Sequence, residues 1–196
     1  ESQAITDAGG CHQLDNPRVV THIELPDLVP TNEEYLRLAA LRVEAINHAL
    51  KGIPEDRVRY HLCWGSWHGP HVTDVPLRDI VDIILGVNAG AYCVEAANPR
   101  HEHEWQGWEN VKLPDGKKLI PGVVAHTTNL VEHPELIAWR ITTYARLLGR
   151  DNVMAGSDCG FSQGAFTARV HPSIMWAKLQ ALTEGAALAS KQLWSK

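Results

Sequence analysis

Hydrophobic and polar positions follow two rhythms along the chain, and these rhythms predict alternating strands and helices. Runs that alternate apolar and polar residues, or are continuously apolar, are typical of strands, whereas apolar residues three and four positions apart are typical of helices. The predicted strands are 10–14, 57–64, 91–97, 119–126 and 152–156. The predicted helices are 31–50, 77–87, 134–148 and 172–193. Strands that alternate with helices indicate repeated strand–helix units and a parallel sheet.

The number of units decides which α/β fold we expect. A TIM-type (βα)8 barrel needs eight strand–helix units, and the pattern supplies about five. The chain opens with ESQAITDAGG, which looks like the middle of a helix, and no linker interrupts residues 1–196. We therefore expect one domain that forms the C-terminal five or so units of a (βα)8 barrel, with the remaining strands supplied by an N-terminal segment or a partner chain.

Composition and charge narrow the class of function. The chain has 196 residues, 44% of them hydrophobic, and 18 basic against 23 acidic residues give a net charge of −5. This balance shows neither a nucleic-acid footprint nor a basic membrane patch. The apolar runs are shorter than the roughly 20 residues of a membrane span. We expect a cytoplasmic protein that acts on small molecules, with no nucleic-acid or membrane partner; the sequence leaves a homo-oligomer open.

The cysteines favour metal or catalytic chemistry. Four cysteines, at positions 11, 63, 93 and 159, are too sparse for a secreted disulfide scaffold, and eleven histidines accompany them. Cys11 is the exception, because its place on the first predicted strand indicates a small buried side chain without chemistry.

Three short motifs stand where predicted strands end. In His61-Leu62-Cys63 the outer side chains lie two residues apart, so both point to one face of the strand. The spacing recurs in Cys93-Val94-Glu95, and Asp158-Cys159-Gly160 follows the last strand. Active sites of α/β barrels lie at this rim, and zinc takes imidazole, thiolate and carboxylate ligands. His61, Cys63 and Cys159 therefore predict a zinc site with either Glu95 or Cys93 as fourth ligand, although an isolated His-x-Cys pair is also typical of a buried strand.

The segments HLCW, VEAANP, PGVVAHTT and GSDCGF, in this order, resemble the C-terminal catalytic domain of the cobalamin-independent methionine synthase family, over nearly the whole chain. The resemblance implies a (βα)8 barrel with Zn²⁺ held by His61, Cys63, Glu95 and Cys159. It also implies a transferase of methionine biosynthesis that activates homocysteine as a zinc-thiolate and methylates it from 5-methyltetrahydrofolate. The product would be a thioether such as methionine.

Further roles follow from the same resemblance. His126 matches a histidine that assists proton transfer at the methyl donor, and Asp15 matches an aspartate that binds the amino group of homocysteine. Asp158, beside Cys159, is expected either to support the metal ligands or to bind substrate, since metal ligands are oriented by outer hydrogen-bond partners.

Several alternatives stay open at this stage. The segments GSWHGPHVTD and ANPRHEHEW resemble short single-barrel relatives, which include zinc enzymes that join a thiol to an epoxide. In those enzymes a cysteine can take the place of the glutamate ligand, and here that cysteine would be Cys93. His68 and His71 are candidate substrate contacts or acids, and the run 101–104 is a candidate lid or second metal site. A hypothesis of another class is a non-catalytic binding subunit with a structural zinc.

Overall fold

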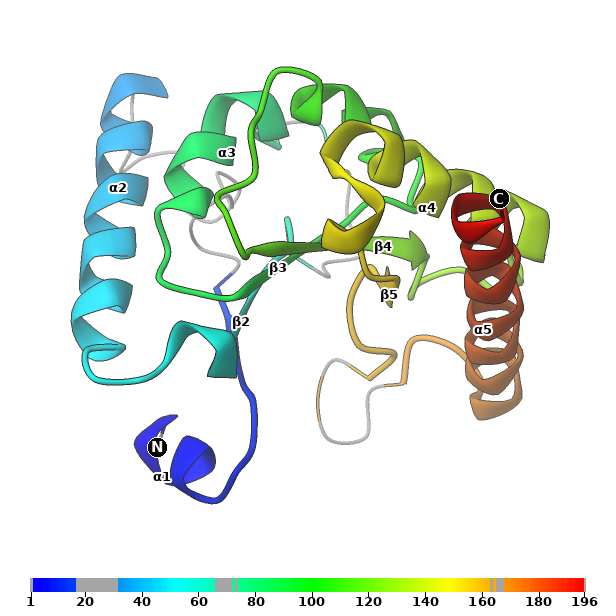
Figure 1. Ribbon diagram of the computed structural model, residues 1–196, viewed down its shortest axis with the longest axis horizontal. Coiled ribbons are helices and arrows are strands. Elements are labelled where there is room, and N and C mark those ends of the chain that lie inside the picture. The colour runs from blue at the N-terminus through cyan, green and yellow to red at the C-terminus, as the bar shows by residue number, and fades with distance from the viewer. Residues whose placement is uncertain are drawn as a thin grey trace. The chain divides into compact units, whose positions relative to one another are not determined.

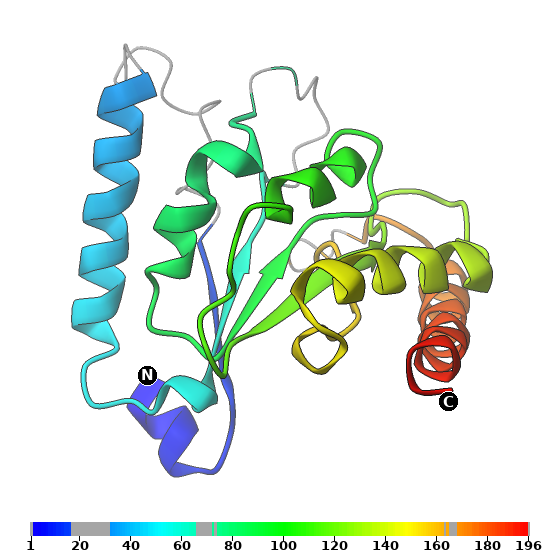
Figure 2. The ribbon, with the colours of Figure 1, turned by 45° about the horizontal axis from the view of Figure 1, so that its top comes forward.

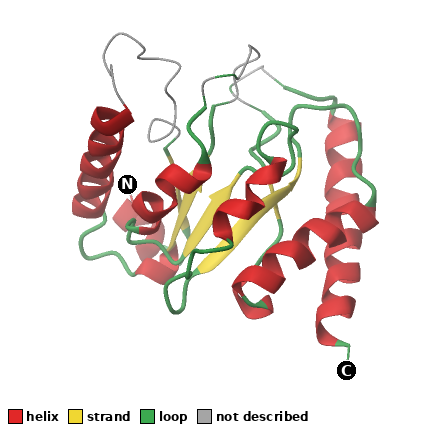
Figure 3. Ribbon diagram, turned by 90° about the horizontal axis from the view of Figure 1, so that it is seen from above, coloured by secondary structure: helices red, strands yellow, loops and turns green. Residues whose placement is uncertain are grey.

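The computed structural model describes residues 2–16, 32–65, 72, 74–162, 164 and 168–195 (Figure 1). Helices and strands alternate along the chain (Figure 3). The elements are α1 Ser2–Asp7, β1 His12–Asp15, α2 Asn32–Ala49, η2 Glu55–Arg57, β2 Val58–Leu62, α3 Leu77–Leu85, β3 Ala91–Val94, η3 Glu102–Trp108, β4 Lys118–Val124, α4 Pro134–Leu148, η4 Arg150–Asn152, β5 Gly156–Ser157 and α5 Pro172–Trp194, where η marks a 3-10 helix. Among the described helices, none has both the length and the hydropathy that a membrane crossing requires.

Within the described residues, five strands form one sheet in the order β1-β2-β3-β4-β5. The pairs β1/β2 and β4/β5 are parallel. A doubly wound sheet reverses its strand order at a switch point, whereas consecutive strands of a (βα)8 barrel lie side by side in chain order. The predicted α/β class and the sheet of about five strands are confirmed, and the strand order is consistent with part of such a barrel.

The fifth strand lies later than the sequence predicts. Residues 152–156 read as a strand, but Arg150–Asn152 form η4, Val153 makes one isolated bridge to Leu119, and β5 is Gly156–Ser157. The cause is local, because the Asn152 side chain donates to the Leu148 carbonyl at 2.9 Å and holds the chain in a turn. The expected burial of Cys11 is also wrong. This cysteine precedes β1 and is exposed.

The described residues divide into two compact units, Glu1–Tyr92 with Asn110–Lys118 and Cys93–Glu109 with Leu119–Lys196. In the first unit, α3 buries Leu77, Ile80, Val81 and Ile84. These positions follow the spacing of one helix face. Asn47 joins α2 to the end of α3, since its side chain donates to the Gly86 carbonyl and accepts from the Asn88 amide, both at 2.8 Å.

In the second unit, α4 and α5 pack against each other (Figures 1 and 2). Both helices begin at a His-Pro pair, in which the imidazole of His133 or His171 accepts the amide of the residue two positions on. Proline is favoured at the first helical position because it needs no hydrogen-bond partner for an amide. Gly185 lets the helices approach closely, since a Cβ there would lie 2.5 Å from the Ile137 Cβ. The core beneath them is Val123, Val124, Ile137, Ala138, Ile141, Ala181 and Ala189.

Candidate metal centre

Strand β2 positions two of the candidate ligands, which we call the β2 half of the site. His61 lies within β2 and Cys63 is the first residue after it, and both side chains are buried. The parallel register sets Asp15 beside His61, and the Asn16 amide donates to the His61 carbonyl at 3.2 Å. Asp15 itself is exposed at the end of β1. Strand pairing therefore fixes the backbone at His61, and Cys63 follows directly after the paired strand.

The other candidate ligands form what we call the carboxylate half, which comprises Glu95, Asn98, Asp158 and Cys159. Glu95 follows β3 directly, Cys159 lies two residues beyond β5, and both are buried. The Cys159 Sγ lies 3.8 Å from Glu95 Oε1, and Glu95 Oε2 accepts a hydrogen bond from Asn98 Nδ2 at 2.7 Å. The thiol is therefore in contact with one carboxylate oxygen of Glu95, and the other carboxylate oxygen accepts a hydrogen bond from Asn98.

Asp158 is the most deeply buried acid of this half, at 1% exposure. Its Oδ1 accepts from the amides of Ala96 and Ala97 at 2.8 and 2.9 Å, and its Oδ2 from Asn98 Nδ2 at 3.2 Å. Burial raises the pKa of Asp158 to about 6, against the opposing effect of these hydrogen bonds, which favour the ionised form. The bonds tie the residue before Cys159 to the backbone after Glu95.

Gly122 on β4 makes room for this arrangement. A Cβ at Gly122 would lie 2.5 Å from the Asp158 Cα and 2.6 Å from its amide nitrogen, distances that side chains do not tolerate. The Asp158 amide in turn donates to the Val124 carbonyl at 3.0 Å. The glycine of PGVVAHTT is therefore required because the backbone at Asp158 runs directly over β4.

Arg140 on α4 supplies the positive charge behind the carboxylate half. Its guanidinium donates to the carbonyls of Val123 and Ala97 at 2.9 and 3.3 Å and pairs with Glu102 Oε1 at 2.6 Å. The charge of Arg140 also lowers the pKa of Asp158, a smaller effect than burial. One buried side chain thus joins β4, the segment after β3 and η3.

His126 lies on the loop that follows β4 and is buried. The loop is anchored by Glu132, whose Oε1 accepts from the Ala125 amide at 2.7 Å and whose Oε2 pairs with Lys178 Nζ at 2.8 Å. Lys178 is completely buried and donates also to the Leu130 carbonyl at 2.5 Å. A buried ion pair therefore holds the chain on both sides of His126.

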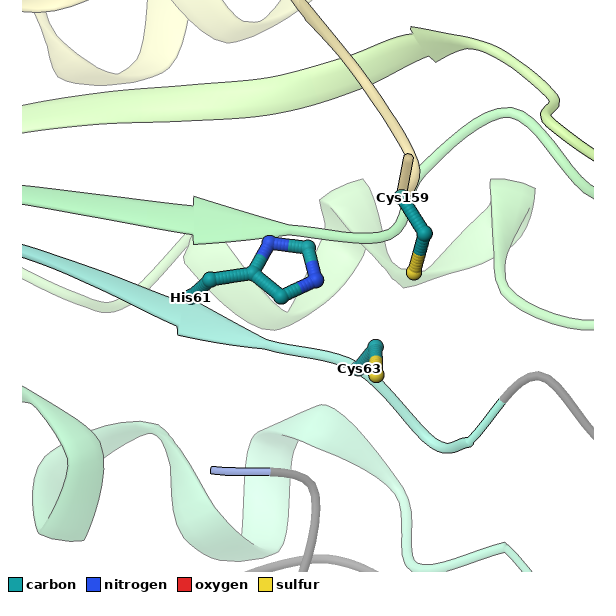
Figure 4. Close-up of side chains that lie close together, drawn as sticks. All are labelled: His61, Cys63 and Cys159. Atoms are coloured by element: carbon teal, nitrogen blue, oxygen red, sulfur yellow. The ribbon is translucent and has the colours of Figure 1, made fainter. Parts of the chain in front are cut away.

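His61, Cys63 and Cys159 form a potential metal-binding group within the described part of the chain. Each offers one ligand atom, and these atoms all lie within 4.8 Å of one another (Figure 4). None of the four cysteines, all of which lie in the described part of the chain, forms a disulfide. Two thiols, an imidazole and the nearby Glu95 carboxylate are the donor types that zinc selects, so the chemistry of this set fits a zinc ion.

The remaining candidates lie elsewhere or have other partners. Cys93 is buried on β3, two residues before Glu95. His101 pairs with Glu104 at 3.0 Å, and both side chains are buried in and before η3. His68 and His71 lie outside the described residues.

Asn98 and Arg140 were missed in the sequence, although Arg140 gives a signal. It occupies a position on the buried face of α4, three residues after Ile137 and four before Tyr144, where an apolar residue is expected. A charged residue in such a position indicates a buried polar network. Asn98 gives no comparable signal, because Asn-Pro is common at the start of any loop.

Comparison with known proteins supports the fold class. No protein-family profile and no curated protein matches the sequence. Among solved structures, the chain is similar to a B12-independent methionine synthase from Shewanella sp. W3-18-1, determined in complex with selenomethionine, with a TM-score of 0.64 and 19% sequence identity. The similarity covers 92% of this chain and 48% of that one. At this identity the likeness shows a shared fold, and the chain spans about half the length of the methionine synthase.

Proposed function

We propose that the chain belongs to a zinc-dependent transferase in which His61, Cys63, Glu95 and Cys159 hold one Zn²⁺ and a thiol substrate is alkylated. The observation that supports this best is the group of one imidazole and two cysteine sulfurs, neither of them in a disulfide, whose ligand atoms lie within 4.8 Å of one another. The Glu95 carboxylate beside Cys159 adds a fourth donor of the kind that zinc accepts. The fold shared with a methionine synthase is consistent with the same proposal.

Zinc bound to these residues supplies a positive charge that lowers the pKa of a coordinated thiol, so that the thiol is ionised near neutral pH. The protein's own side chains do the rest. Cys63 and Cys159 would hold the metal as thiolates, and their burial would limit access of water to it. Glu95 would supply a carboxylate ligand; its Oε1 lies 3.8 Å from the Cys159 Sγ, while Asn98 holds Oε2.

We assign proton transfer to His126. An imidazole can release a proton near neutral pH, which suits it to protonate the departing group of the alkyl donor. The ion pair of Glu132 and Lys178 holds its loop in place. Asp15, exposed at the end of β1, is suited to bind the amino group of a homocysteine-like substrate.

The two roles expected for Asp158 can be ranked on its contacts. Both of its oxygens accept hydrogen bonds from the chain itself, and the side chain is buried. These contacts favour a supporting role for Asp158 over direct binding of substrate.

The test is X-ray absorption at the zinc edge of the zinc-loaded protein, with and without homocysteine. We expect one additional sulfur ligand when the thiol is added, because in a catalytic site the substrate thiol can displace the weakest protein ligand or expand the coordination. An unchanged coordination shell would favour a closed structural zinc and a binding subunit instead. Thioether formation from the same thiol with a methyltetrahydrofolate, and separately with a small epoxide, would then identify the electrophile, for which we rank methyl transfer first.

A further inference from the structure

Asn98 uses its whole hydrogen-bonding capacity within the carboxylate half. Its side-chain nitrogen Nδ2 donates one hydrogen to Glu95 Oε2 at 2.7 Å and the other toward Asp158 Oδ2 at 3.2 Å. Its side-chain oxygen Oδ1 accepts from the backbone amides of Arg100 and His101 at 3.0 and 3.1 Å. The opposite orientation of the side-chain amide would place an oxygen against two carboxylates, so these partners fix which way it points.

This arrangement gives the two oxygens of Glu95 different environments. Oε2 is held by the short bond from Asn98, a charge-assisted contact of the stronger kind. Oε1 lies on the side of the Cys159 thiol, 3.8 Å from Sγ. The donor from Asn98 also lies between two buried carboxylates and offsets their mutual repulsion.

We propose that Asn98 is a positioning residue for the metal: it holds Glu95 Oε2 so that Glu95 presents Oε1 alone to the zinc. The inference rests on the proposed function, because it takes Glu95 to be a zinc ligand. Asn98 contacts no reacting atom and acts through Glu95. Outer hydrogen-bond partners of metal ligands commonly change metal affinity by about 10- to 100-fold.

Two substitutions separate this role from the role of Asn98 in the loop. Asn98→Ser keeps an oxygen that can accept the amides of Arg100 and His101, but its shorter side chain withdraws the donor from Glu95. Asn98→Ala removes both functions. Asn129→Ala, at an exposed position after β4, is the matched control.

The experiment measures zinc affinity by competition with a chromophoric chelator and records the visible spectrum of the cobalt-substituted protein. We expect Asn98→Ser and Asn98→Ala to bind zinc about 10- to 100-fold more weakly than wild type, and the cobalt bands to shift because the carboxylate ligand is altered. Asn129→Ala should match wild type. Wild-type affinity and spectrum in Asn98→Ser would overturn the inference and leave the zinc site intact.

Combining Asn98→Ser with Glu95→Gln makes the test independent of any loss of stability. If Asn98 acts through Glu95, the double variant should bind zinc no more weakly than Glu95→Gln alone, whereas fully additive losses would contradict the role. Failure of the proposed function has a different signature, since wild-type protein would then show no cobalt–thiolate absorption at all, and the inference would fall with it.

Discussion

The two halves of the candidate metal centre are built in different ways. In the β2 half, His61 lies within a paired strand and Cys63 follows that strand directly, so the strand backbone places both residues. In the carboxylate half, Glu95 and Cys159 lie beyond their strands and are held by buried polar side chains. The comparison shows two ways to place a ligand near a strand end: by the paired backbone of the strand, and by a network of buried hydrogen bonds and charges.

If the second unit depends on buried charges, removing one should have a large effect on stability. Lys178→Met should lower the free energy of unfolding by about 3–5 kcal/mol, because Glu132 would remain buried without its partner. Urea unfolding of the zinc-free protein measures this. Lys191→Met, at an exposed position of the same helix, should change stability by less than about 0.5 kcal/mol. Equal stability of the two variants would show that the ion pair does not hold the loop.

Zinc that binds ligands from both halves should raise the free energy of unfolding of the protein. At a free zinc concentration of about 100 times the dissociation constant, mass action predicts about 2.7 kcal/mol of stabilisation of the wild-type protein. Thermal unfolding with zinc and with a chelator measures it. Cys63→Ser and Cys159→Ser should each lose most of this increment. If zinc stabilises one of the two variants as strongly as wild type, that cysteine is not a ligand.

The close contact under Asp158 gives a smaller effect that is specific to the carboxylate half. Gly122→Ala should destabilise the protein by about 1–3 kcal/mol, since the new methyl group overlaps the backbone at Asp158, and it should also weaken zinc binding. Gly160→Ala is the matched control, because the nearest atom to a Cβ there is 3.9 Å away. Comparable unfolding curves for Gly122→Ala and wild type would mean that β4 can yield at this position.

The smallest effect on stability is expected at Asp15. Asp15→Asn should change the free energy of unfolding by less than about 0.5 kcal/mol, because the residue is exposed. If Asp15 binds the substrate amino group, the same variant should raise KM for homocysteine and leave zinc content unchanged. An unchanged KM would remove Asp15 from the proposed site.

The sequence is a good guide to the strands and a poorer one to the segments beyond their ends. The hydrophobic period and the turn residues predict α4 to the residue and place the first four strands, because each of these elements depends on neighbours in the chain. The same reasoning predicts the β2 half, since side chains two residues apart on a strand point to the same face of the sheet. The fifth strand was misplaced because a side-chain bond from Asn152 competes with strand pairing.

The hydrogen bonds that support the carboxylate half could not be predicted from the sequence, for a physical reason. Asp158 meets Ala96, Ala97 and Asn98 across about 60 residues of chain, and no local pattern encodes such a meeting. Only Arg140, a charge on the buried face of α4, signals that a polar network exists. Its partners become visible only in three dimensions.

A zinc site formed by both halves is tested by the zinc content of the purified protein and of three cysteine variants. We predict about one zinc per chain in wild type and in Cys11→Ser, whose cysteine is exposed and outside the site, and little or none in Cys63→Ser and Cys159→Ser. Zinc retained in full by either of the last two variants, or no zinc in wild type after loading, would contradict a metal centre shared by the two halves.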